Sequence, residues 1–236
     1  MTDYADLENR LSRVLQLRNH PVAVTFRETA PANVVPFAGT EPSTCSFWRL
    51  AAEGRTFHTV AADHYNCPIG SYTHNLPLPA GRAHELDQVL GLMTDIGYVK
   101  MEEVPKIPRL PRTPGVIIYA PLADTPVDPD LVLMNAKPGR LMLLYEAALR
   151  AGVDVQAPLL GRPTCMAVPA ALAMGVISSI GCIGNRVYTD LPDDELYVTI
   201  PGKDLARITD ELGVITQANN VLIDYHRGRR EALATQ

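Results

Sequence analysis

Apolar side chains recur along the chain at spacings that switch between those of helices and those of strands. In the first half, this pattern predicts a helix over residues 5–17, a strand over 22–26 and a loop over 28–43. A short helix over 46–53 and a strand over 56–61 follow. A further helix with one buried face follows Pro79, Ala80 and Gly81. The alternation of short helices and strands indicates an α/β protein.

The second half shows the same order of elements. Its apolar spacing predicts a helix over residues 141–149, a short strand over 153–155 and a loop over 158–163. A helix over 165–174 and a strand over 176–180 follow. Pro201 and Gly202 then introduce a last helix. The common order suggests an internal duplication, although α/β proteins also repeat such units by chance.

A proline-rich segment separates the two halves. Pro105, Pro108, Pro111 and Pro114 recur every third residue, so in a polyproline II helix they share one face. This spacing is found in ligands of proline-binding domains, but its place between the halves favours a stiff connector. We therefore expect two similar lobes with mixed sheets and helices. They would span residues 1–104 and 116–236, with residues 105–115 as the connector.

Two apolar runs follow the connector. Residues 116–119 and 131–134 are continuous runs of large apolar side chains, which is typical of strands covered on both faces. We expect them to be buried strands of one shared sheet.

Composition and charge exclude several classes of protein. The chain has 236 residues, of which 47% are hydrophobic, and a net charge of -5. It has no basic patch interleaved with aromatic residues, so nucleic acid is not an expected partner. No apolar run reaches the length of a membrane span, and the polar N-terminus is unlike a secretory signal. We therefore expect a cytoplasmic protein that does not enter the membrane.

Four cysteines are the main candidates for chemistry. Each half places one cysteine after a threonine, as Thr44-Cys45 and Thr164-Cys165, and a second in a glycine- or proline-marked turn. The two turns contain Cys67 and Cys182. A duplicated unit with two thiols can bring four thiols to one point, where they bind a soft metal or an iron–sulfur cluster. We therefore predict that the four side chains converge as cofactor and metal ligands.

The spacing of the cysteines is not that of a zinc ribbon. Structural zinc sites usually draw their ligands from close pairs such as Cys-x-x-Cys, and this chain has none. Two other interpretations stay open. One or two of the thiols can be functional without a metal, or all four can be buried packing residues, because free cysteine is among the most buried residue types.

Histidines and arginines near the cysteines extend the candidate site. His64 precedes Cys67 by three residues, so it can act as a further ligand or as the base that activates Cys67 as a nucleophile. Arg49, Arg162 and Arg186 each lie within four residues of a cysteine, where a guanidinium can hold a carboxylate or phosphate. We expect Arg186 to be aimed inward by the Gly184-Asn185 turn. The catalytic candidates are thus Cys67, His64 and Arg186.

Several runs resemble a known family when they are taken together. They are Cys45-Ser46-Phe47-Trp48-Arg49, Asn66-Cys67-Pro68-Ile69-Gly70, Gly161-Arg162-Pro163-Thr164-Cys165 and Gly181-Cys182-Ile183-Gly184-Asn185-Arg186-Val187-Tyr188. The chain is similar over nearly its whole length to the domain of unknown function 169 family of archaea and bacteria. This resemblance implies a common fold and draws attention to these motifs. It implies no activity, cofactor or catalytic residue.

Three functions follow as hypotheses. The first is a four-cysteine iron–sulfur or metal protein that acts in electron transfer with a redox partner protein, or on a small anionic substrate. The second is a metal-free thiol enzyme that uses Cys67. The third is a binding module for a tetrapyrrole or another small molecule. The chain lacks the glycine-rich dinucleotide motif, the Walker A lysine motif, the Gly-x-Ser-x-Gly elbow and the His-Glu-x-x-His zinc motif.

Overall fold

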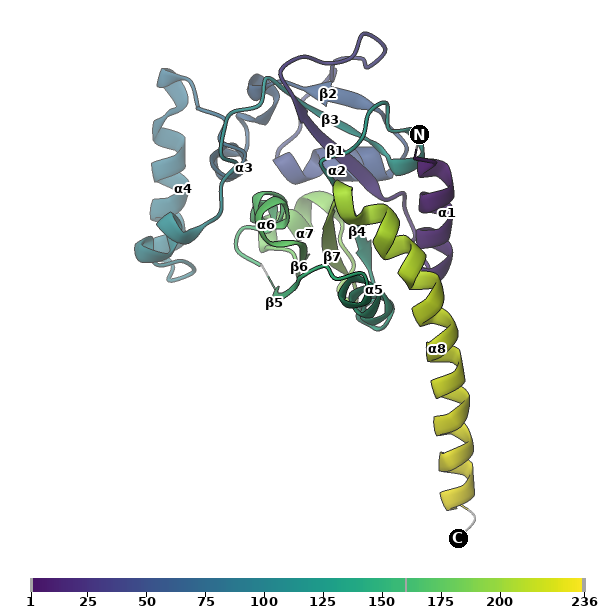
Figure 1. The fold of residues 1–236 in the computed structure, drawn as a ribbon. Helices are drawn as coiled ribbons and strands as arrows, with labels where there is room; N and C mark the ends of the chain where they lie inside the picture. Colours follow the sequence, from purple (N-terminus) through teal and green to yellow (C-terminus); the bar gives the residue numbers. More distant parts are fainter. Residues whose placement is uncertain (1, 160, 235–236) are drawn as a thin grey trace.

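The computed structural model describes residues 2–159 and 161–234, and one seven-stranded sheet runs through it (Figure 1). The strand order is β2-β3-β1-β4-β7-β6-β5, and all neighbours are antiparallel except β5 and β6. The strands are β1 (Val22–Arg27), β2 (Phe57–Thr59), β3 (Val116–Pro121), β4 (Leu131–Ala136), β5 (Val155–Leu159), β6 (Val176–Ser179) and β7 (Leu196–Pro201). The expected mixed α/β fold is confirmed, and both apolar runs after the connector are buried strands of this sheet.

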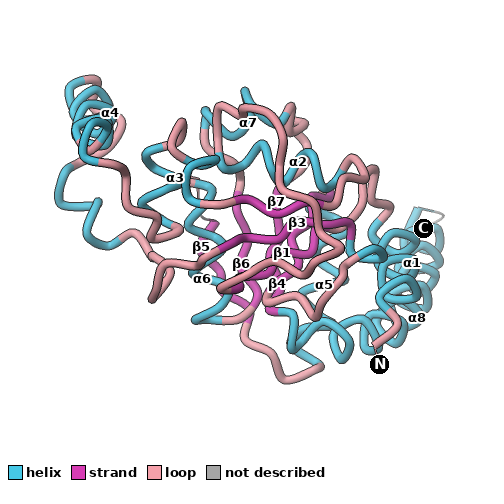
Figure 2. The backbone as a smooth tube through the Cα atoms, turned by 90° about the horizontal axis from the view of Figure 1, so that it is seen from above, coloured by secondary structure: helices cyan, strands magenta, loops and turns pink. Residues whose placement is uncertain are grey.

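Helices cover both faces of the sheet (Figures 1 and 2). They are α1 (Tyr4–Leu15), α2 (Thr44–Ala52), α3 (Pro68–Thr73), α4 (His84–Asp95), α5 (Pro138–Arg150), α6 (Ala167–Met174), α7 (Ile183–Thr189) and α8 (Gly202–Ala234). Short 3-10 turns include η1 (Ala61–His64), η3 (Met101–Lys106) and η5 (Thr164–Met166). In both views α4 stands apart from the sheet, and Figure 1 shows α8 extending away from the body.

The alternation of side chains along the central strands divides the interior into two cores. In β4, Val132 and Met134 pack against α1, α5 and α8, whereas Leu131 and Leu133 point to the other face and pack against α2. Both sets are fully buried, and burying one such side chain contributes about 1.5–3 kcal/mol. Because strand side chains alternate, a shift of one residue in register would expose both cores.

The two halves of the sheet are paired in matching registers around the β1–β4 contact. β3 lies between β1 and β2, and β7 lies between β4 and β6. Pro121 at the end of β3 pairs with Val22 at the start of β1, and Pro201 at the end of β7 pairs with Leu131 at the start of β4. This arrangement is that of a pseudo-twofold axis through the β1–β4 pair.

The outer strands follow the same relation. Thr59 of β2 pairs with Ile117, and Ser179 of β6 pairs with Tyr197. Thr59 follows Cys45 by 14 positions, and Ser179 follows Cys165 by 14. The equivalent elements are therefore β1 and β4, β2 and β6, and β3 and β7. Descent of the two halves from one duplicated unit stays a prediction.

Some details of the expected correspondence are wrong. The strand expected at residues 153–155 was matched with β1, but it forms β5, which lies at the sheet edge and pairs in parallel with β6. The short helices α3 and α7 were expected as turns, and strand β7 was not expected. The helix α5 and strand β5 are thus additions to the second half, as α4 is an addition to the first.

The proline-rich segment lies along the end of α3. Pro105 belongs to η3, and the chain then runs irregularly to β3. The amide of Leu110 donates to the carbonyl of Thr73 at 2.9 Å, and Arg109 donates to the carbonyl of Tyr72 at 2.9 Å. The division into lobes at this segment stays a prediction, and strands from both sides of it pair in one sheet.

Gly202 provides a test of the close approach at the end of β7. A Cβ atom at this position would lie 1.8 Å from the carbonyl oxygen of Pro129, which is a backbone atom that cannot rotate away. We expect Gly202→Ala to lower the free energy of unfolding by about 1–3 kcal/mol, as overpacking does. Gly139→Ala is the matched control, because nothing lies within 4 Å of the added methyl group. Urea unfolding measures both, and equal stability of the two variants would contradict the packing described here.

Candidate functional site

The four cysteines line one cavity of about 710 Å³. Cys45 lies in the first turn of α2 and Cys165 in η5, and both are buried. Cys67 and Cys182 are the N-cap residues of α3 and α7 and are half-buried. The structure thus gathers the four side chains that the sequence singled out, two from each half of the pseudo-twofold arrangement.

The two capping cysteines are held in the same way. The Sγ of Cys67 accepts the amide of Gly70 at 3.3 Å, and the Sγ of Cys182 accepts the amide of Asn185 at 3.5 Å. Each sulfur therefore faces the free amides of a helix start, which favour negative charge. Gly70 is required at its position, because a Cβ atom there would lie 2.1 Å from the Oγ1 of Thr44.

Threonines bind the cysteine segments to their surroundings. The Oγ1 of Thr164 accepts the amide of Cys182 at 2.5 Å, which joins η5 to the start of α7. The Oγ1 of Thr44 lies 3.1 Å from the Nδ1 of His64, which joins α2 to η1. Both threonines are fully buried. The Thr-Cys pairs of the sequence thus combine a thiol with a side chain that fixes the loop behind it.

Burial and mutual repulsion keep the innermost thiols protonated. Burial raises the pKa of Cys45 well above its ordinary value, and the neighbouring sulfurs of Cys165, Cys67 and Cys182 raise it further. Burial also raises the pKa of Cys165, with a contribution from Cys67. Four thiolates cannot share this cavity without a compensating positive charge. A bound cation would supply that charge and displace the protons.

Two buried polar side chains beside the thiols lack hydrogen-bond partners. The hydroxyl group of Tyr119 is buried without a partner; burial raises its pKa, and the nearby Cys45 and Cys165 raise it further. The amide of Asn185, which lines the cavity, also has no hydrogen bond of normal geometry, although it is close enough to Cys45 to lower that thiol's pKa slightly. Unpaired buried donors are rare and call for an explanation.

His64 does not contact Cys67 as a base would. Its Nδ1 lies 3.1 Å from the Oγ1 of Thr44 and its Nε2 lies 2.8 Å from the Oγ1 of Thr59, so both ring nitrogens are engaged. Burial lowers the pKa of His64 well below its ordinary value, and His74 lowers it further. An imidazole that is neutral and hydrogen-bonded at both ring nitrogens has a structural role here and does not activate a neighbouring thiol.

The three arginines near the cysteines have different positions. Arg162 lines the cavity and donates to the carbonyl of Tyr98. Arg186 donates to the carbonyls of Ile180 and Pro192, so its expected inward orientation is wrong. Its guanidinium instead holds the loop that follows α7.

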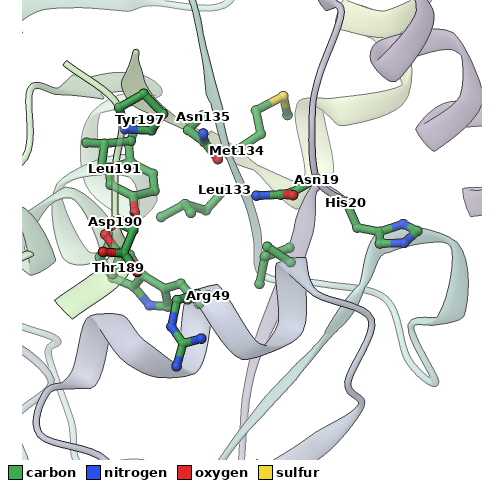
Figure 3. Close-up of a pocket in the computed structure, with 14 residues that line it drawn as sticks. Asn19, His20, Arg49, Leu133, Met134, Asn135, Thr189, Asp190, Leu191 and Tyr197 are labelled. Carbon is green, nitrogen blue, oxygen red and sulfur yellow. Dashed lines mark hydrogen bonds between the residues drawn. The ribbon is translucent and has the colours of Figure 1, made fainter. Parts of the chain in front are cut away.

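Arg49 and Trp48 lie at a second, smaller hollow of about 50 Å³. Figure 3 shows the guanidinium of Arg49 pointing away from Asn135 and Tyr197, and it pairs with Glu53 at 2.9 Å. Trp48 is buried and packs edge-to-face on Tyr197. This hollow has room for a few water molecules only, so the cysteine cavity is the candidate site.

The cysteines do not form a site for a single metal ion. Within residues 2–159 and 161–234, no three His, Cys, Asp or Glu side chains are grouped as ligands of one ion. Ligands of one zinc ion must all reach the same point, whereas those of an iron–sulfur cluster bind different iron atoms and stand further apart.

The other wall of the cavity was not predicted from the sequence. It is formed by the segment of residues 89–108, which carries apolar side chains from α4 to the end of η3. Leu92 and Ile96 are 61% and 68% exposed, although they line a concave surface. The helical spacing of this segment predicted a helix with a buried face. The sequence alone does not distinguish an apolar helix face that borders a cavity from one that is packed in the core.

Comparison with known proteins gives a family and nothing further. The model of the DUF169 family, described as uncharacterised ArCR, matches residues 10–211, and the chain belongs to this family. No curated protein and no solved structure matches the chain. Within the described part of the chain, no helix is both long and apolar enough to cross a membrane.

The buried histidines predict a loss of stability in acid. Burial lowers the pKa of His74 to about 4, so its contribution is complete above the unfolded value of about 6.5 and is lost as pH falls toward 4. We expect His74 alone to lower the free energy of unfolding by about 2 kcal/mol between pH 7 and pH 5. Urea unfolding at the two pH values measures this.

The acid effect has a matched control in the same region of the chain. His74→Gln removes the titrating group and is expected to reduce the difference between the two pH values. His84→Gln changes an exposed histidine and is expected to leave it unchanged. An equal pH dependence in wild type and His74→Gln would contradict the assignment to His74.

Proposed function

We propose that this member of the DUF169 family is an iron–sulfur protein whose cluster is held by Cys45, Cys67, Cys165 and Cys182. The observation that carries the proposal is the presence of four cysteines, drawn from four separate elements, on the wall of one cavity. Four thiolates are the usual ligand set of such clusters. The function that follows is electron transfer, in which the reduced cluster loses one electron to an acceptor and regains one from a redox partner protein.

The electrostatics of the site support a cationic centre. Without one, burial and repulsion hold Cys45 and Cys165 as neutral thiols. Iron ions reverse this balance, because a metal-bound thiol is deprotonated and its proton is released. The cluster supplies the one-electron chemistry, and the chain's own residues supply the thiolates and the surrounding hydrogen bonds.

The unpaired donors support the same ligand. A thiolate or sulfide sulfur accepts hydrogen bonds, and the hydroxyl of Tyr119 and the amide of Asn185 are donors without partners beside Cys45. The backbone amides of Gly70 and Asn185 already donate to cysteine sulfurs. Such donors stabilise the more negative, reduced state of a cluster and so set its potential.

The metal-free thiol enzyme has less support. Its base would be His64, whose two ring nitrogens are already bonded to Thr44 and Thr59. The expected substrate-binding Arg186 lies outside the lining of the cavity and is bonded to backbone carbonyls. The iron–sulfur proposal uses all four cysteines and needs neither residue.

The central test is iron binding by the whole chain and by four single variants. Anaerobically reconstituted wild type is expected to bind iron and acid-labile sulfide and to absorb visible light. Replacing any one of the four cysteines by serine should strongly reduce the iron content, because serine is a poor ligand for a soft metal. Iron and sulfide analysis together with the visible spectrum measure the effect.

Controls separate loss of ligation from loss of folding. Thr216→Ala, in the middle of α8 and outside the lining of the cavity, should keep full iron content, and circular dichroism should show that each cysteine variant is folded. The proposal is overturned if the wild type binds no iron under these conditions. It is also overturned if folded variants at two or more of the cysteines keep wild-type iron.

The unpaired donors give a prediction for the reduction potential. Tyr119→Phe removes the hydroxyl group and keeps the ring, so we expect unchanged iron content and a lower potential, because the reduced cluster loses a hydrogen bond. Redox titration followed by electron paramagnetic resonance measures the shift. Tyr145→Phe is the control, since its hydroxyl bonds to Ser178 on the opposite face of the sheet. A potential that moves equally in both variants, or in neither, would refute the role of Tyr119.

A further inference from the structure

The cavity beside the cysteines is larger and more apolar than a metal centre needs. Its volume of about 710 Å³ is within the range of pockets for drug-sized molecules. One wall carries the four thiols and Asn185, and the facing wall is the segment of residues 89–108. We propose that this space binds an amphipathic organic anion, with its apolar body against that segment and its acidic group at Lys106 and Arg162.

The apolar side chains of the cavity are exposed where a ligand would cover them. Leu92, Ile96 and Ile183 all line it, and their exposed fractions are 61%, 68% and 65%. Leu92 belongs to α4, Ile96 directly follows this helix, and Ile183 is the first residue of α7. Exposed apolar side chains gathered in a concave surface are typical of ligand sites, because the ligand removes them from water.

The charges at the cavity favour an acidic group. Arg162, Lys106 and Glu103 are the charged residues that line it, and their sum is one positive charge. The guanidinium of Arg162 stands 3.8 Å from Glu103 and lies over the ring of Tyr98. Lys106 is exposed at the end of η3. An ammonium and a guanidinium beside an apolar wall suit a carboxylate or sulfonate on an aromatic or aliphatic body.

The proposed ligand would lie in the same cavity as the four cysteines. The side-chain oxygen of Asn185, a residue that is 2% exposed on the cavity wall, has no hydrogen-bond partner and can accept a hydrogen bond from a polar group of the ligand. That the ligand would lie beside a redox centre rests on the proposed iron–sulfur function. Its binding does not, because the apolar wall and the two cations are present without a metal.

The test uses 8-anilinonaphthalene-1-sulfonate as the probe, because it is an apolar body with one sulfonate. We expect saturable binding to the native full chain, and binding about tenfold weaker in Ile183→Glu, which places a charge on the apolar wall. Lys106→Glu should weaken binding of the sulfonate probe and leave binding of its neutral analogue N-phenyl-1-naphthylamine unchanged. Fluorescence titration measures both, and near-ultraviolet circular dichroism confirms that each variant is folded.

Val221→Glu is the matched control, because Val221 is 70% exposed on α8, away from the cavity. It should bind the probe as the wild type does. The inference is overturned if the native chain shows no saturable binding, if Ile183→Glu binds normally, or if Val221→Glu abolishes binding. Probe binding by a chain that never takes up iron would refute the iron–sulfur proposal alone. Normal iron content without probe binding would refute this inference alone.

Discussion

The antiparallel pairing of β1 with β4 is the contact on which the rest of the structure depends. It joins the two halves of the sheet, and the flanking strands repeat on either side in the same register, with Pro121 opposite Val22 and Pro201 opposite Leu131. Because register decides which side chains face the helices, this pairing also decides that the two Thr-Cys segments lie on the same face. A cavity lined by thiols from both halves follows from that geometry.

The same face combines opposing electrostatic demands. Burial favours neutral thiols at Cys45 and Cys165, whereas the sulfurs of Cys67 and Cys182 accept backbone amides at helix starts, where negative charge is favoured. A protein that kept these residues only for packing would gain nothing from amide donors at two sulfurs or from an unpaired hydroxyl at Tyr119. All of these features are compatible if the sulfurs carry negative charge around a cationic centre, which is the basis of the proposed iron–sulfur function.

Local sequence patterns predicted much of the fold because they report local preferences. The spacing of apolar residues identified α1, β1, α2, β2, α5, α6 and β6 close to their observed bounds. The helices α3 and α7 were not predicted, because each is one or two turns long and begins at a cysteine beside glycine or proline. Such a sequence is equally typical of a turn. β7 was not predicted because its apolar run lies directly between acidic residues 193–195 and Pro201-Gly202, which were interpreted as the start of a helix.

The candidate site was predictable only in part, for a related reason. The repeated Thr-Cys and Cys-turn motifs predicted that four thiols share one place, since equivalent segments of a repeat occupy equivalent positions. The pairing of β1 with β4 joins residues more than a hundred positions apart, and no local pattern encodes it. The roles of His64 and Arg186 depended on which atoms surround them, so proximity in sequence to a cysteine was a poor guide.

The two halves differ where the cavity opens. The first half carries the added segment with α4, and the second half carries the added α5 and β5, which lie at the other face and edge of the sheet. The thiols are therefore arranged with pseudo-twofold symmetry, but the space beside them is walled by α4 on one side only. The set of four thiols is symmetric, whereas the cavity beside it is not. An electron acceptor or an organic anion would therefore reach the cysteines through this cavity, which residues of α4 and α7 line.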